Sequence, residues 1–253
     1  MKENKEIIRK RFARSFKTYD EQAHAQEQIA ASLTRLIEAK CSQPETAMEI
    51  GCGTGLLTKK LFRWTPDAHW YLNDIVEELK PLLEDSWKAW GAKKVDFRAG
   101  DAEQLDIPKN LDLVVSASTI QWFGQLDTFF NTCHKALNEN GQLVFSTFGP
   151  NNLKEVKKLT GNGLEYPSQE ELEQLLEPNF KIEFIQQENI KLVFKSPTDV
   201  LRHLSKTGVN GSGCNHWNKA MLNDFCKKYI DQFSSENGVK LTYQPIYVVA
   251  SKK

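Results

Sequence analysis

Hydrophobic residues recur at helical spacing through the first forty residues. Polar and charged residues separate them, as expected for a helix with one buried face. Asp20 is expected to interrupt or cap this helix, and a second helical stretch is expected over 23–37. Pro44 then ends the pattern, which predicts a helical N-terminal lid over 1–40. The apolar face, with spacings of four, four and three, consists of Ile8, Phe12, Phe16 and Tyr19.

From residue 44 onward, short apolar runs alternate with amphipathic segments. Strands separated by helices are typical of a parallel sheet with helices on both faces, so the pattern predicts an α/β fold. The expected strands are 47–50, 70–73, 95–99, 111–116 and 142–148. The expected helices between them are 56–64, 77–90 and 128–137.

The pattern changes after Phe148. A helix is expected over 169–176, extended segments over 181–185 and 190–194, and helices over 198–205 and 219–233. Residues 195–235 are interpreted as a helical insertion that shapes the substrate pocket, and 240–253 as the final strand. The whole chain, 1–253, is then one domain whose sheet core includes 44–150.

Composition favours a cytoplasmic protein without a membrane segment or a metal site. No apolar run approaches the roughly 20 residues that cross a bilayer, and the charged N-terminus lacks the apolar stretch of a secretory signal. The five cysteines are odd in number and widely spaced, which suits a reducing compartment and argues against disulfides and zinc. They are Cys41, Cys52, Cys133, Cys214 and Cys226.

The net charge is zero, but cations gather near the N-terminus. Nucleic-acid substrates call for broad basic surfaces, so the neutral balance argues against RNA or DNA as partners. A local basic cluster indicates either a contact with an anionic partner or a solvated helix face. The cluster consists of Arg9, Lys10, Arg11 and Arg14, with Lys154, Lys157 and Lys158 as a second candidate.

Glu49-Ile50-Gly51-Cys52-Gly53-Thr54-Gly55 follows the first expected strand and precedes a helix. Glycines at such a turn admit a ligand close to the backbone, although a turn also needs glycine for structural reasons. The GxGxG spacing is one residue shorter than the dinucleotide fingerprint, which favours a nucleoside without a pyrophosphate.

Two acids follow the next two strands. Asp74 lies 19 residues after Gly55, where a carboxylate can accept hydrogen bonds from ribose hydroxyls. Asp101, followed by Ala102, ends the third strand, where an adenine amino group can bind. The fourth strand ends at Ser116, at the same carboxyl edge of the sheet, where open α/β sheets bind ligands.

With these residues the chain resembles the class I S-adenosylmethionine-dependent methyltransferases, which have a Rossmann-like fold with a mostly parallel seven-stranded sheet. The resemblance covers about residues 44–150. It implies that S-adenosylmethionine is the cofactor and S-adenosylhomocysteine the product. It places the glycines at the methionine part, Asp74 at the ribose, and Asp101 with Ala102 at the adenine. The implied cofactor residues are Glu49, Gly51, Cys52, Gly53, Gly55, Asp74, Ile75, Asp101, Ala102 and Ser116.

Further motifs resemble the malonyl-[acyl-carrier protein] O-methyltransferases of biotin synthesis, the BioC family. They are 11–20 with Ala23 and Gln26, 118–123, 146–150 and 204–210. The resemblance implies transfer of a methyl group to the free carboxylate of malonyl-loaded acyl carrier protein or malonyl-CoA, by a monomer. The Gln121-Trp122 pair also occurs in trans-aconitate methyltransferases, so a free small acid is the alternative acceptor. An RNA or protein methyltransferase and a non-catalytic cofactor-binding protein are further alternatives.

Methylating a carboxylate needs no strong base, because the group is already ionised at pH 7. It needs donors and a cation that orient the acceptor. A basic rim would attract an acidic carrier protein, and an apolar tunnel lined by Phe12, Phe16 and Phe148 would take its pantetheine arm. Each candidate also has an ordinary packing or surface role. The candidates are Tyr19, Gln121, Trp122, Arg202, His203 and Lys206.

Overall fold

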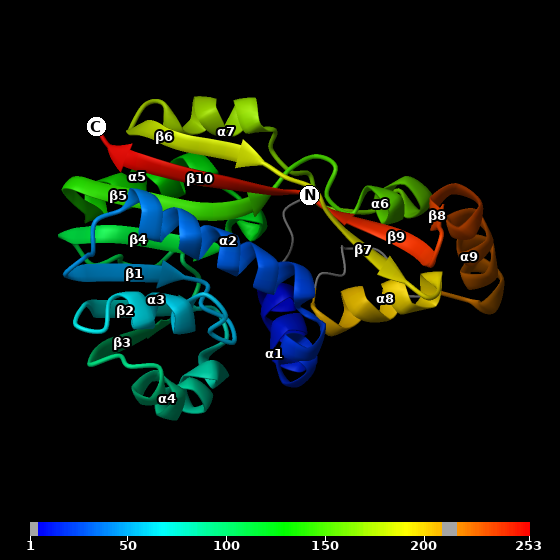
Figure 1. Ribbon diagram of the computed structural model, residues 1–253, viewed down its shortest axis with the longest axis horizontal. Helices are drawn as coiled ribbons and strands as arrows, with labels where there is room; N and C mark the ends of the chain where they lie inside the picture. Colours follow the sequence, from blue (N-terminus) through cyan, green and yellow to red (C-terminus); the bar gives the residue numbers. More distant parts are fainter. Residues whose placement is uncertain (1–4, 209–216) are drawn as a thin grey trace.

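The computed structural model describes residues 5–208 and 217–253, except for the side chain of Lys17. The predicted loop 208–215 and Cys214 therefore lie outside the described residues, apart from Gly208. The molecule consists of a larger lobe around a seven-stranded sheet and a smaller lobe around a three-stranded sheet (Figure 1). Among the described helices, none is long and apolar enough to cross a membrane.

The large sheet has the strand order β3-β2-β1-β4-β5-β10-β6. β1 to β5 pair in parallel, while β10 runs antiparallel to both of its neighbours. This mostly parallel seven-stranded sheet confirms the predicted fold class. The strands are β1 (Thr46–Ile50), β2 (His69–Asp74), β3 (Lys94–Ala99), β4 (Leu111–Ala117), β5 (Leu137–Phe148), β6 (Phe180–Gln187) and β10 (Pro245–Lys252).

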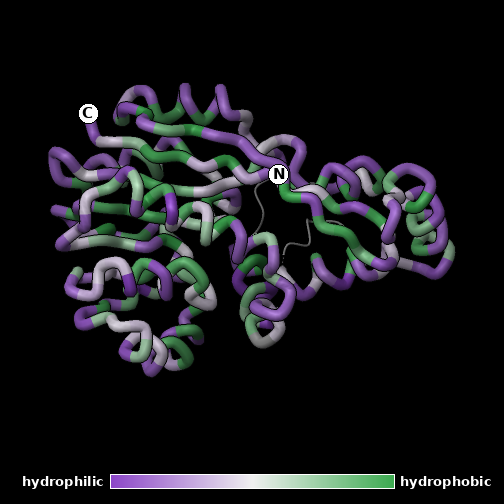
Figure 2. Tube along the Cα trace, in the orientation of Figure 1, coloured by the Kyte–Doolittle hydropathy of each residue, from purple (hydrophilic) through white to green (hydrophobic). Residues whose placement is uncertain are grey.

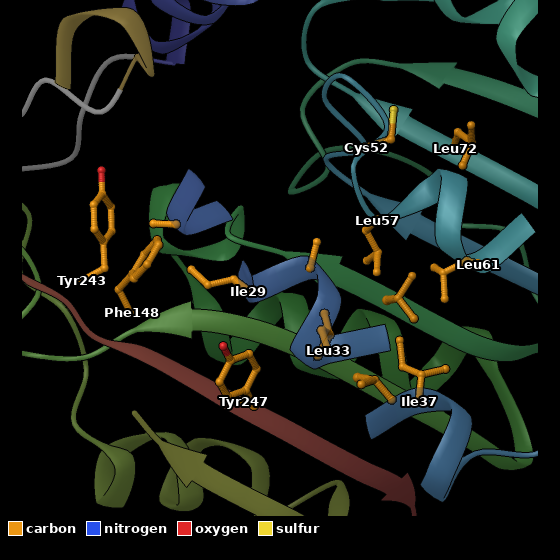
Figure 3. Close-up of a cluster of buried hydrophobic side chains, with 14 of the residues drawn as sticks. Ile29, Leu33, Ile37, Cys52, Leu57, Leu61, Leu72, Phe148, Tyr243 and Tyr247 are labelled. Atoms are coloured by element: carbon orange, nitrogen blue, oxygen red, sulfur yellow. The ribbon is translucent and has the colours of Figure 1, made fainter. Parts of the chain in front are cut away.

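Helices cover both faces of this sheet because alternate strand residues point to opposite sides. Ala47 packs into the cluster under α2, α3 and α4, whereas the next residue, Met48, packs into the cluster under α5 and α7. Figure 3 shows Leu33 and Ile37 of α2 in the first cluster, and the hydrophobic stretches of Figure 2 follow the strands. These helices are α2 (His24–Lys40), α3 (Thr58–Trp64), α4 (Lys80–Ala89), α5 (Leu126–Ala136) and α7 (Gln169–Leu176).

The smaller lobe joins α6, α8 and α9 to the sheet β7-β9-β8. The N-terminal helix α1 (Lys5–Gln22) contacts α8, so it lies at the junction of the two lobes (Figure 1). The predicted insertion 195–235 thus supplies α8 and α9 of this lobe. The elements are α6 (Lys154–Thr160), β7 (Ile190–Phe194), α8 (Pro197–Lys206), α9 (Lys219–Phe233), β8 (Ser234–Ser235) and β9 (Gly238–Tyr243).

The prediction of one final strand over 240–253 is wrong. The run divides at Gln244 into β9, which belongs to the small sheet, and β10, which belongs to the large sheet. The backbone amide of Gln244 donates to the Asn152 side chain, and its side-chain oxygen accepts from the amide of Asn151. The residues on both sides of Gln244 are mostly apolar, aromatic or β-branched, so the sequence predicts one continuous strand. The break between β9 and β10 depends on the contacts of Gln244 with Asn151 and Asn152.

Other boundaries also move. The first helix ends at Gln22 rather than at Asp20, and the strand expected at 142 begins at Leu137, which pairs with Leu111 of β4. The helix expected over 77–90 opens as the 3-10 turn η1 (Glu77–Leu79) before α4. The seven-residue helix α6 was not predicted from the sequence.

Candidate active site

A cavity lies between α1 and the carboxyl ends of the first four strands of the large sheet. The glycine loop after β1, the ends of β2 and β3 and the segment after β4 form its floor, and the apolar face of α1 forms its roof. The predicted cofactor residues that line it are Glu49, Gly51, Cys52, Gly53, Asp74, Ile75, Asp101 and Ala102.

The glycine loop has an open side and a packed side. Gly53 has φ +51°, and a Cβ built on it would meet no atom within 4 Å, so its backbone faces free space in the cavity. Gly55 has φ +88° and does not line the cavity; a Cβ there would lie 2.5 Å from the ring of Trp90. The missing Cβ of Gly53 therefore leaves room for a ligand, whereas the missing Cβ of Gly55 leaves room for the ring of Trp90, the residue that follows α4.

Asp74 holds the glycine loop from the end of β2. Its carboxylate accepts from the backbone amide of Gly53 at 2.8 Å and from that of Val76 at 2.9 Å. Burial raises the pKa of Asp74, and these backbone hydrogen bonds act in the opposite direction. The carboxylate thus ties together two loops that line the cavity.

Glu49 is the second buried carboxyl group of the cavity. It is 1% exposed, and it accepts from the hydroxyl of Thr58 at 2.7 Å. Burial raises the pKa of Glu49 to about 8, against a smaller opposing effect of that hydrogen bond. A carboxyl group with this pKa is largely protonated at neutral pH.

Polar contacts of three side chains hold α1 over the cavity. The Lys5 ammonium lies 3.1 Å from Asp101 and 2.7 Å from Glu103. Arg9 lies 3.0 Å from Glu78, which follows β2. Near the far end of the helix, the Thr54 hydroxyl donates to Asp20 at 2.6 Å. The N-terminal helix therefore covers the cavity along its length.

The acceptor candidates divide into two groups. Tyr19 and Trp122 line the cavity, and burial raises the pKa of Tyr19, so its hydroxyl stays protonated. Gln121 lies outside the cavity lining and donates to the carbonyl of Ser118 at 2.5 Å. Ser116, which was predicted as a cofactor residue rather than an acceptor residue, also lies outside the lining, and its hydroxyl donates to the carbonyl of Ile50 at 3.0 Å.

The insertion does not bring its candidates to the cavity. Arg202 pairs with Asp199 in the same helix, and its side chain is exposed. His203 is buried, and its Nε2 forms a 2.8 Å hydrogen bond with the hydroxyl of Tyr243. Burial lowers the pKa of His203 to about 4. None of the described residues of 195–235 lines the cavity, although Gly208, just after α8, packs against Phe12. A direct role for Arg202 or His203 in the cavity is thus not supported.

The expected apolar tunnel is corrected in one place. Phe12 and Phe16 line the cavity, and the Phe12 ring meets Trp122 edge-on at 5.7 Å between centroids. Phe148 lies outside the lining and packs instead against Tyr166. It also packs against Tyr243 (Figure 3). It ends β5, which lies beyond the four strands whose carboxyl ends form the cavity floor.

Several lining residues were not predicted as site residues. Ser118 and Thr119 follow β4, and Gln26 and Ala30 are one turn apart on α2. The first pair stood in a motif next to Gln121, so position after a strand was an available signal. Gln26 stood in the N-terminal family motif, but that motif did not indicate a place in the cavity, which depends on how α2 packs.

The lining suits a cofactor with both polar and apolar parts. Within the part of the chain that the structure describes, two buried lining atoms lack a hydrogen-bond partner, namely the Gln26 side-chain oxygen and the Trp122 indole nitrogen. Buried polar groups are ordinarily satisfied, so a bound molecule that both donates and accepts is expected here. The open backbone at Gly53 gives such a molecule access.

The chain is similar to known methyltransferases over its whole length. A family model described as a methyltransferase domain matches residues 48–145. The chain is 39% identical to the malonyl-[acyl-carrier protein] O-methyltransferase of Bacteroides thetaiotaomicron, with 99% of each covered. The enzyme of the same name from Haemophilus ducreyi is also 39% identical, with 98% of this chain and 97% of the relative covered. The chain belongs to the malonyl-[acyl-carrier protein] O-methyltransferase family.

Solved structures share the fold of this family member at low sequence identity. YcgJ from Bacillus subtilis superposes with a TM-score of 0.66 at 14% identity, covering 88% of this chain and 98% of that one. The N-methyltransferase NodS from Bradyrhizobium japonicum, solved with S-adenosylhomocysteine, has a TM-score of 0.52 at 15% identity, covering 88% and 85%. The family assignment confirms the predictions of a methyltransferase and of S-adenosylmethionine as its cofactor.

Proposed function

We propose that this protein transfers a methyl group from S-adenosylmethionine to the free carboxylate of a malonyl thioester carried on acyl carrier protein, the step that primes biotin synthesis. The observation that carries the proposal is the unpaired indole N–H of Trp122, buried in the same cavity as the glycine loop. The names of the full-length relatives support malonyl as the acceptor.

The proposed cofactor site follows the floor of the cavity. Gly51 and Gly53 would face the methionine part, Asp74 the ribose hydroxyls, and Asp101 with Ala102 the adenine. When bound, S-adenosylmethionine supplies a methyl group on a positively charged sulfur. The chain's own residues have to align a carboxylate with that group, and alignment can contribute on the order of 7–11 kcal/mol to the rate.

Two donors are available to hold the acceptor carboxylate. Trp122 offers its unpaired N–H, and Tyr19 offers a hydroxyl that burial keeps protonated. No general base is required, because the carboxylate is ionised at neutral pH. Ile8, Phe12 and Phe16 on the roof exclude water, and a carboxylate stripped of water is a better nucleophile.

The approach of an acidic carrier protein is assigned to α1 and α8, which contact each other. Arg14 on α1 is exposed, and Lys206 ends α8 next to Gly208, which packs against the roof residue Phe12. Arg9 and Lys10 are paired with acids on their own helix. We therefore place the carrier contact around Arg14 and Lys206 rather than around the whole N-terminal cluster. Use of malonyl-CoA, a monomeric state and a cytoplasmic location are also part of the proposal.

The test is methyl transfer from labelled S-adenosylmethionine to malonyl-[acyl-carrier protein], malonyl-CoA and trans-aconitate, offered separately. We expect the carrier-bound malonyl group to be preferred, and Trp122→Phe, which keeps the ring but removes the N–H, to raise KM for the acceptor. Transfer to trans-aconitate alone would contradict the proposed acceptor while leaving the methyltransferase assignment intact.

A further inference from the structure

Gln26 is a buried polar residue of the cavity that has no role in the proposed reaction. It lies near the start of α2 and is 6% exposed, and Ala30, one turn later, lines the same cavity. Its side-chain oxygen has no hydrogen-bond partner among the residues that the structure describes. An unpaired buried carbonyl is unfavourable, so an acceptor at this place indicates a ligand group that donates or carries positive charge.

The orientation of the Gln26 amide follows from its neighbour Tyr243. Burial raises the pKa of Tyr243, the nearby Tyr19 adds to this, and side-chain hydrogen bonding by Gln26 and Thr207 acts in the opposite direction. The Gln26 oxygen has no partner among the described residues, so the NH2 group is the end of the amide that we assign to Tyr243.

Tyr243 is held in turn by His203. The Tyr243 hydroxyl and the His203 Nε2 are 2.8 Å apart, and both residues are buried, with exposures of 0% and 1%. Because His203 has a pKa of about 4, it is neutral at pH 7, and one ring nitrogen accepts a hydrogen bond. We therefore assign the single hydroxyl proton of Tyr243 to His203, which leaves the Tyr243 oxygen available to accept from the Gln26 NH2 group.

We propose that Gln26 is a cofactor-positioning residue whose side-chain oxygen faces a cationic group at the methionine end of S-adenosylmethionine, and that Tyr243 and His203 fix its orientation. Tyr243 and His203 are positioning residues that act through Gln26. The inference rests on the proposed function only in its cofactor. Two groups of that cofactor share the required chemistry, the sulfonium and the α-ammonium.

A neutral amide fits this place better than a carboxylate would. A carbonyl dipole attracts a positive charge but repels an incoming malonyl carboxylate far less than a full negative charge does. A cavity that has to hold a cation and an anion side by side therefore favours glutamine. This accounts for an uncharged acceptor in a cavity that the carboxyl groups of Glu49 and Asp74 also line.

Binding of S-adenosylmethionine and of S-adenosylhomocysteine by calorimetry, without acceptor, tests the inference. We expect Gln26→Met, which keeps the length but lacks the amide, to weaken S-adenosylmethionine about fivefold to thirtyfold. Gln26→Glu should tighten it. A weakening confined to S-adenosylmethionine assigns the sulfonium, because the product lacks that charge; equal weakening of both assigns the ammonium.

Tyr243→Phe removes only the hydroxyl, and we expect it to weaken cofactor binding in the same pattern as Gln26→Met, though less. The matched control is Tyr229→Phe, which removes a hydroxyl bonded to the Lys240 carbonyl in the smaller lobe, away from the cavity. If the folded Gln26 and Tyr243 variants bind both molecules as the wild type does, or change only the KM for the acceptor, the inference is wrong. Cofactor binding without any methylation of malonyl thioesters would instead contradict the proposed function alone.

Discussion

The ammonium of Lys5 lies 3.1 Å from the carboxylate of Asp101, and 2.7 Å from that of Glu103. The first described residue of the roof helix is therefore bonded to the carboxylate that was predicted to bind the adenine. The same ammonium lies 4.7 Å from the centre of the Phe123 ring, which also lines the cavity. One side chain of the roof helix therefore contacts both the predicted adenine-binding carboxylate and the cavity lining.

Lys5→Met should speed release of S-adenosylhomocysteine. The substitution keeps the apolar stem but removes an ion pair that is partly exposed, and such pairs contribute up to about 1 kcal/mol, or roughly fivefold. Stopped-flow tryptophan fluorescence measures the release rate. Lys93→Met, which removes an exposed pair with Asp67, is the control. An unchanged release rate in the Lys5 variant would mean that the pair does not hold the helix closed.

Glu49→Gln should make the stability of the ligand-free protein less sensitive to pH. Burial raises the pKa of Glu49 from 4.5 to about 8, so the folded protein retains a proton that the unfolded chain releases. Wild-type stability is therefore lost as pH rises from about 4.5 to about 8, by an amount on the order of a few kcal/mol. Glutamine does not ionise, so the stability of Glu49→Gln should not fall in this pH range for this reason.

Urea unfolding at several pH values measures the effect, with Glu165→Gln, an exposed carboxylate paired with Lys157, as the control. The stability difference between the Glu49 variant and the wild type should grow across this pH window. A constant difference would show that Glu49 is ionised in the folded protein.

Asp74→Ala should weaken cofactor binding by about 1–3 kcal/mol, because it removes the partner of the Gly53 amide together with the expected ribose acceptor. Calorimetry with S-adenosylhomocysteine measures this loss. Asp112→Ala is a matched control, since Asp112 likewise accepts from two backbone amides, those of Glu45 and Thr46, and does not line the cavity. Equal affinities of the two variants for S-adenosylhomocysteine would contradict the role of Asp74 in cofactor binding.

Gly55→Ala should destabilise the protein by roughly 2–4 kcal/mol, since its Cβ would lie 2.5 Å from Trp90 at a positive φ. Gly161→Ala, at φ +68° with open space, should cost only the backbone strain of about 1–2 kcal/mol. Adding Trp90→Leu to Gly55→Ala should recover the difference between them. Unfolding in denaturant tests this, and independent effects of the two changes would show that the clash is relieved elsewhere.

Arg14→Glu with Lys206→Glu should slow transfer to carrier-bound malonyl several-fold, while sparing malonyl-CoA, because steering by charge depends on the protein partner. Arg9 is left unchanged, since its pair with Glu78 belongs to the closure of the roof helix. The comparison of kcat/KM for the two substrates measures the effect, and added salt should reduce it. Equal losses on both substrates would place these residues in the acceptor pocket instead of on a docking surface.

The sequence by itself determined the features that depend on local spacing. The alternation of strands and helices, the glycine loop at 49–55 and the acids that end the second and third strands all lie within short windows. Strand carboxyl ends meet at one sheet edge, so Asp74 and Asp101 are placed beside the glycine loop without further information.

Contacts between distant segments decided the rest. The position of Gln26 in the cavity depends on the packing of α2, and the bond between His203 and Tyr243 joins residues 40 positions apart. The break at Gln244 depends on Asn151 and Asn152, more than 90 positions earlier. Hydrophobic periodicity records only which face of an element is buried, whereas the partner buried against it is fixed by the tertiary structure.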